Sequence, residues 1–163
     1  QWPSSAASDV YKRQIFTTSS FADGHKGKID LKGFIVGDNK FLTDNEGNFL
    51  TFTYDGVGGL MAVEGTTFMD NASQYCLGAG TIPGKGFEMG HCKINQMDGD
   101  TIFTYYEIPL GDSMNGTFKC LGGTGKYKGI ECSGSTGYTP INSAQENKFA
   151  SSIYFKGEYS LMK

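Results

Sequence analysis

The sequence predicts an all-β fold, a single antiparallel β-barrel of about eight strands. Three observations lead to this prediction. Glycine accounts for 24 of the 163 residues, about twice its usual share of roughly 7%. Aromatic residues make up 13% of the chain, and aromatic side chains favour strands. Short apolar segments are separated by turn sequences, and no stretch of twelve residues carries a convincing helical period.

The expected strands follow one another at short intervals. The first, residues 28–37, alternates Ile29 and Leu31 with Asp30 and Lys32. The second, residues 49–54, is rich in aromatic and β-branched residues. The third, residues 60–63, is a short apolar piece that follows two glycines. The remaining ones are apolar, aromatic or β-branched segments of strand length. These eight further strands are expected at 49–54, 60–63, 74–82, 87–95, 101–108, 117–121, 131–138 and 152–161.

Turn sequences separate these segments. The clearest hairpin signal is Met97-Asp98-Gly99-Asp100, which lies between two strong strands. Residues 44–48 (DNEGN), 83–86 (PGKG) and 122–125 (GGTG) are further turns. We expect the sheet to close into a barrel, because closure removes the edge strands that an aromatic-rich sheet would otherwise have to protect.

Residues 1–22 are expected to lie outside the domain, which would then span residues 23–163. Residues 1–14 hold the only Trp and the only Arg of the chain and no glycine, and they look like a sequence artefact. Residues 15–22 (IFTTSSFA) end with small residues at the −3 and −1 positions of a signal-peptidase site, as in a signal-peptide remnant. An ordinary N-terminal tail is the alternative.

Charge and motif spacing exclude several classes of partner. The formal net charge is −3 and no basic cluster exists, which argues against nucleic acid. No apolar run approaches eighteen residues, so no membrane span is expected. The GGTGK sequence at 122–126 is not a phosphate loop, because Tyr127 stands where Ser or Thr is required. The widely spaced Cys and the two His do not match a common metal site, so neither a metal nor a cofactor is expected.

The four cysteines are expected to form disulfides in an oxidising compartment, which indicates a secreted or periplasmic protein. Four cysteines allow three pairings. We expect Cys76–Cys92 and Cys120–Cys132, because each pair flanks one strand-to-strand connection. Buried free thiols are the alternative.

The candidate ligand-binding residues come from the strongest strands. If the barrel holds an apolar pocket, we expect aromatic side chains to line it. The candidates are Phe103, Tyr105, Tyr106, Phe118 and Phe155.

Glu88 and Glu107 are the candidate catalytic residues if the protein is an enzyme. Both belong to expected strands, and a carboxyl group inside an apolar lumen has a raised pKa and can act as a general acid or base. Tyr105, Tyr106 and Tyr138 could supply hydroxyl partners. Alternation alone does not decide whether Glu107 faces the lumen or the solvent.

A more specific pattern lies in the second half of the chain. Residues 119–134 read KCLGGTGKYKGIECSG, a strand, a glycine-rich turn and a second strand. This resembles the G-G-[ST]-G-x-[FY]-x-G-[AI] hairpin of the allene oxide cyclase and dirigent-like barrels. The segments 89–94 and 99–106 are similar to that family in type and spacing, so the resemblance covers about residues 74–138.

The resemblance implies an eight-stranded barrel with a lumen for an apolar ligand, often in a homo-oligomer. Plant allene oxide cyclases place a carboxylate on an early strand deep in the barrel. Asp30 is the only candidate for that position in the first expected strand, and the activity is not carried over.

Three functions are compatible with these observations. The leading hypothesis is a barrel that binds a small apolar molecule in its lumen. The second is an isomerase or cyclase that holds a lipid- or polyketide-like substrate in a reactive conformation. The third is a structural or interaction module with a filled barrel. Fold alone does not separate them; an open lumen and the position of a carboxylate within it would.

Overall fold

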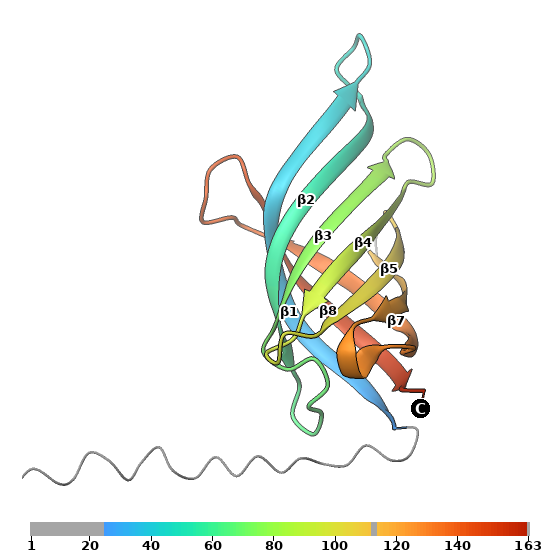
Figure 1. The fold of residues 1–163 in the computed structure, drawn as a ribbon. Coiled ribbons are helices and arrows are strands. Elements are labelled where there is room, and N and C mark those ends of the chain that lie inside the picture. The colour runs from blue at the N-terminus through green and yellow to red at the C-terminus, as the bar shows by residue number, and fades with distance from the viewer. Residues whose placement is uncertain (1–24, 112–113, 163) are drawn as a thin grey trace, which may run out of the picture.

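The computed structural model describes residues 25–111 and 114–162. The expected leader at 1–22 therefore lies outside the described residues. The described part forms eight strands and one short 3-10 helix, η1 (Gly125–Tyr127) (Figure 1). The strands are β1 (Lys26–Thr43), β2 (Phe49–Ala62), β3 (Ala72–Thr81), β4 (Phe87–Asn95), β5 (Thr101–Pro109), β6 (Asn115–Gly123), β7 (Glu131–Ile141) and β8 (Phe149–Ser160).

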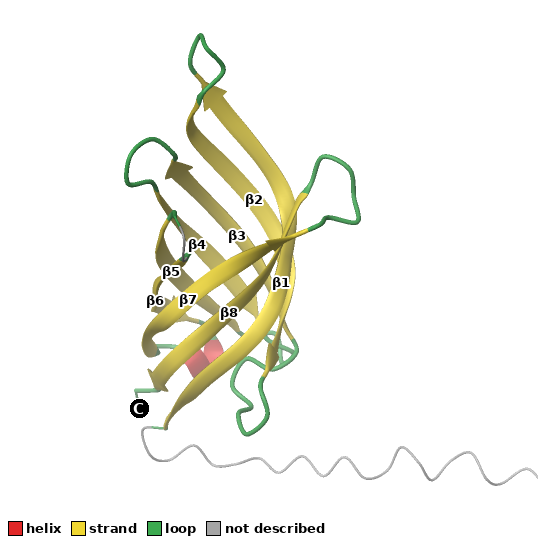
Figure 2. Cartoon of the chain, turned by 180° about the vertical axis from the view of Figure 1, so that it is seen from behind, coloured by secondary structure: helices red, strands yellow, loops and turns green. Residues whose placement is uncertain are grey.

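The strands form a closed antiparallel barrel in which each strand pairs with its neighbours in sequence and β1 pairs with β8 (Figure 2). This confirms the predicted fold class. A row of paired residues that starts at Asn39 on β1 passes through every strand and returns to β1 at Ile29. The strands are therefore strongly staggered, as closure of a tilted sheet requires.

The expected strands at 49–54 and 60–63 are one continuous strand, β2. The glycines between them suggested an interruption. They are instead needed for the close approach of β1, because a Cβ atom at Gly58 would overlap the carbonyl oxygen of Phe34. The β1–β2 hairpin extends beyond the rest of the barrel (Figure 1).

The two ends of the barrel differ. At one end, called the closed end below, inward side chains of β1–β5 pack tightly; Leu31, Leu60 and Ile102 are at most 1% exposed. Phe68 from the β2–β3 loop stacks on Tyr159 with ring centroids 3.8 Å apart. Tyr127 of η1 meets the same Phe68 ring edge-on. These side chains fill the β1–β5 side of this end. The other, the open end, carries the β1–β2, β3–β4, β5–β6 and β7–β8 connections.

Both predicted disulfides are present. Cys76 and Cys92 are register partners on β3 and β4, with Cα atoms 4.1 Å apart. Cys120 and Cys132 join β6 to β7 across the glycine-rich turn, with Cα atoms 4.9 Å apart. The described residues include no free cysteine. The first disulfide is buried inside the barrel, and this position matters for the site described next.

Candidate functional site: a cavity inside the barrel

A cavity of about 460 Å³ occupies the barrel between the open end and the packed closed end. Most of its lining is apolar or aromatic, and the residues at its mouth include Phe41, Phe52 and Ile141. Ligand cavities in proteins commonly measure roughly 300–1,000 Å³ and carry a few convergent polar groups in an apolar lining. The polar side chains here, tyrosines apart, are Asn39, Gln74, Glu88, Thr136, Lys148 and Ser151.

Among the described residues that line the cavity, Glu88 carries the one carboxyl group. Its side chain is 6% exposed. It accepts a hydrogen bond from the Tyr138 hydroxyl at 3.0 Å and another from the Tyr106 hydroxyl at 3.2 Å. The three side chains come from β4, β5 and β7, so the closed barrel is what brings them together.

Burial raises the pKa of Glu88 to about 7, and the hydrogen bond from Tyr138 opposes part of that shift. Burial is also the main reason that the pKa of each tyrosine hydroxyl lies above its usual range. Both tyrosines therefore remain neutral donors at physiological pH. Glu88 exchanges its proton near neutral pH, so it can donate a hydrogen bond or accept a proton in the same pH range.

Two glycines create the space for this arrangement. Gly78 and Gly90 are register partners on β3 and β4, and both face the Tyr106 side chain. A Cβ atom at Gly90 would overlap the Tyr106 hydroxyl, and one at Gly78 would lie 2.7 Å from it. The absence of side chains at these two positions lets the Tyr106 hydroxyl reach Glu88.

The structure places the candidate ligand-binding residues in three different environments. Tyr106 and Phe155 line the cavity. Phe118 is buried and packs edge-on against Phe155, with ring centroids 5.1 Å apart, but it is not a lining residue. Phe103 and Tyr105 lie on the outer face of β5, so the expectation that they line the lumen is corrected.

The outer face of β5 explains that error. Residues Ile102, Thr104, Tyr106 and Ile108 are buried in alternation with more exposed ones. The outer Tyr105 ring nevertheless finds partners, since the His91 ring lies 5.3 Å away and the Lys119 Nζ lies 5.5 Å from its centroid. Because both faces carry aromatic residues, alternation in the sequence did not distinguish them.

The candidate carboxylates are likewise separated. Glu88 lines the cavity, whereas Glu107 is exposed on the outer face of β5. Asp30 alternates with the buried Ile29 and Leu31, and its carboxylate lies 3.9 Å from the Lys156 Nζ. Neither Glu107 nor Asp30 is among the lining residues, so of these three candidates only Glu88 can deliver a carboxyl group to a molecule in the cavity.

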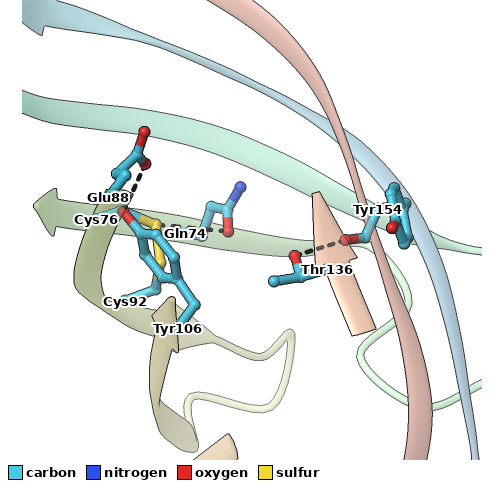
Figure 3. Close-up of a disulfide and its surroundings, with 7 residues drawn as sticks. All are labelled: Gln74, Cys76, Glu88, Cys92, Tyr106, Thr136 and Tyr154. Carbon is cyan, nitrogen blue, oxygen red and sulfur yellow. Dashed lines mark hydrogen bonds between the residues drawn. A yellow bond between two sulfur atoms is a disulfide. The ribbon is translucent and has the colours of Figure 1, made fainter. Parts of the chain in front are cut away.

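One lining residue that the sequence did not single out is Gln74. It lies on β3 two positions before Cys76, and Figure 3 shows it between the Cys76–Cys92 disulfide and Thr136. Because successive side chains of a strand alternate between its two faces, Gln74 shares the inner face of β3 with Cys76. The described residues contain no group of three His, Cys, Asp or Glu side chains that could hold a metal ion.

No protein-family model matches the chain, and no curated protein matches it. Across the described ranges, no helix has the length and apolar character needed to cross a membrane. The class of protein is therefore defined by the fold and the site, an eight-stranded antiparallel barrel with an open apolar cavity and one buried carboxyl group.

Proposed function

We propose that the protein binds a small, mainly apolar molecule in the barrel cavity. The cavity itself supports this proposal, since about 460 Å³ of apolar-lined space remains beside the tightly packed inward side chains of β1–β5. A filled barrel that served only as an interaction module would have no need of this space. Apolar burial contributes roughly 25 cal/mol per Å² before ordering costs, which is enough for micromolar affinity.

Binding can be measured with N-phenyl-1-naphthylamine, a neutral apolar dye whose fluorescence rises in apolar surroundings. We expect one saturable site. Ser151→Trp places a large ring in the cavity and should abolish binding, whereas Ser152→Trp, on the exposed face of the same strand, should leave it unchanged. Equal binding by the wild type and the Ser151→Trp variant would reject the cavity as the site.

An isomerase or cyclase acting on a lipid- or polyketide-like substrate is the second candidate. The observation that favours it is Glu88, a buried carboxyl group with a pKa near 7 beside two tyrosine hydroxyls. A general acid or base works best when its pKa lies near the working pH. Catalysis would then consist of proton transfer at Glu88 within a shielded and shape-selective cavity.

This second candidate has a direct test. A base at Glu88 would accelerate deuterium exchange at the carbon atoms next to the carbonyl of 2-nonanone in D₂O, followed by mass spectrometry. Glu88→Gln should still bind the dye and should lose the exchange. Glu107→Gln is the control, because its side chain lies outside the barrel. Exchange that is no faster than with the Glu88→Gln variant would leave binding alone as the function.

Two further proposals concern context. Two disulfides among the described residues support a secreted or periplasmic location, since such bonds persist in oxidising compartments. The eight-stranded barrel is compatible with membership of the allene oxide cyclase and dirigent-like barrels, and with the homo-oligomers of that family. Free thiols in protein isolated from its native compartment would contradict the proposed location.

A further inference from the structure

Gln74 has an unusual environment for a buried amide. Its side chain is 3% exposed and lines the cavity. Its Nε2 atom has no hydrogen-bond partner among the described residues. Its Oε1 atom lies 3.7 Å from the Cys76 sulfur, but that sulfur belongs to a disulfide and has no proton to donate. The whole carboxamide is therefore unpaired among the described residues.

A buried amide without partners is costly, because it loses its hydrogen bonds to water and gains none in return. The position of Gln74 shows which groups could satisfy it. Its register neighbour Ile94 belongs to the packed closed end, whereas Ile35, in the same row, lines the cavity. Gln74 thus lies at the floor of the cavity. Its Nε2 atom is buried, so a ligand oxygen would pair with the amide once the terminal carboxamide turns toward the cavity.

We propose that Gln74 is a specificity-determining residue that binds a neutral oxygen atom at the inner end of the ligand. This inference rests on the proposed binding function and names the class of ligand, an apolar molecule with a carbonyl or hydroxyl oxygen at the end that enters first. The amide offers both a donor and an acceptor, so either oxygen group can pair with it.

The charge distribution of the cavity supports a neutral inner end. Lys148 is the one cationic side chain among the described residues that line the cavity, and its Nζ is paired with Asp38 on β1. Asp38 is closer to the open end than Ile35, which lies in the same row of paired residues as Gln74. A carboxylate at the floor would meet no positive charge, and a buried unpaired anion is strongly unfavourable. A carbonyl or hydroxyl group has no such penalty once it is hydrogen-bonded.

Two probes of nearly equal shape test the inference. In 2-methyl-1-nonene, a CH₂ group replaces the carbonyl oxygen of 2-nonanone. Each is titrated against bound N-phenyl-1-naphthylamine in the wild type and in Gln74→Leu. The ratio of the two affinities is compared, because changes in cavity volume affect both probes alike. We expect Gln74→Leu to lower the preference for the ketone about tenfold, the equivalent of one net hydrogen bond.

Thr104→Val is the matched control. The Thr104 hydroxyl is also buried without a partner among the described residues, and it lies opposite Cys92, but it does not line the cavity. This variant should keep the wild-type ketone preference. A ratio that falls equally in both variants, or that stays unchanged in Gln74→Leu, would overturn the role of Gln74 while leaving the binding function in place. Absence of dye binding in the wild type would instead reject the binding function itself.

A second measurement guards against a purely structural role. If the amide serves the ligand, then Gln74→Leu should raise the Tm of the ligand-free protein by roughly 2–4 °C, since an unpaired buried group is removed. A lower Tm would show that Gln74 stabilises the barrel and would count against the inference. Gln74→Met, with a flexible side chain of similar length, gives the same comparison if Gln74→Leu fails to fold.

Discussion

The Tyr138 hydroxyl lies 3.0 Å from a carboxylate oxygen of Glu88, although the two residues are separated by 50 positions in the sequence. This contact crosses the interior of the barrel from β7 to β4. Because β4 and β7 are not neighbours in the sheet, the two side chains meet only when the sheet closes into a barrel. The proton affinity of Glu88 therefore depends on that closure. Its consequences can be measured in stability and in titration.

The stability of the protein should depend on the charge of Glu88. Its pKa rises from 4.5 in the unfolded chain to about 7 in the barrel. The folded state therefore binds the proton more tightly, and this contribution to stability is complete below pH 4.5 and is lost as the pH rises through 7. A pKa difference of this size corresponds to about 3 kcal/mol.

Glu88→Gln removes that titration. Urea unfolding of the variant and the wild type should show a difference in free energy of unfolding that moves by about 3 kcal/mol in favour of the variant between pH 4 and pH 8. Glu107→Gln, on the exposed outer face, is the control, and it should leave the contribution of Glu88 in place. If the difference in free energy of unfolding between Glu88→Gln and the wild type does not change with pH, then the barrel does not raise the pKa of Glu88.

Tyr138→Phe should raise the pKa of Glu88 above 7. The Tyr138 hydroxyl donates to the carboxylate, which favours the charged form, and the phenyl ring keeps the packing but removes that donor. Carbon-13 NMR of labelled glutamate carboxyl groups measures the titration. In the control Tyr154→Phe, the lost hydroxyl donates to Asn115 on a different part of the barrel, so the titration should not move.

Gly90→Ala should destabilise the barrel by about 1–3 kcal/mol, because the new methyl group would overlap the Tyr106 hydroxyl. It should also displace that hydroxyl from Glu88. Gly59→Ala is the matched substitution on β2, where the nearest side-chain atom would be 3.5 Å away, an ordinary contact. Chemical denaturation compares the two, and equal effects would show that the space at Gly90 is not needed for Tyr106.

Loss of the Cys120–Cys132 disulfide should cost about 3 kcal/mol on the chain-entropy model, because the bond closes a short loop in the unfolded chain. The measurement is a urea unfolding curve of the variant in which both cysteines are replaced by serine, recorded with and without a reductant. The reductant should still destabilise this variant through the remaining Cys76–Cys92 bond. If the variant unfolds at the wild-type urea midpoint, the stability of the β6–β7 hairpin does not depend on the Cys120–Cys132 disulfide.

Local sequence patterns were sufficient for the fold class and both cysteine pairs. Turn sequences marked the connections between strands, and neighbouring strands place the paired cysteines within bonding distance. Strand boundaries were less accurate where glycine continued a strand, as at Gly58 on β2. There the identity of the residue reflects the close approach of β1, which is a property of the tertiary structure.

The site was only partly predictable. Glu88, Tyr106 and Tyr138 were candidates in the sequence, but their contact depends on the diameter and stagger of the barrel. Phe103 and Tyr105 were misplaced because apolar residues occupy both faces of β5. Gln74 gave no signal of its own, since an isolated glutamine in a strand is ordinary unless the inward face is known.

The pairing of β1 with β8 has a consequence for how the molecule folds. Every other strand pair joins neighbours in the sequence, but this seam joins Lys26–Gly37 to Phe149–Ser160. Such a contact closes a loop that contains nearly the whole domain, and contacts between distant residues slow folding. During synthesis, one edge of β1 stays unpaired until β8 has been made, and an unpaired edge is prone to aggregation. We therefore expect closure of this seam to be the slowest step of folding.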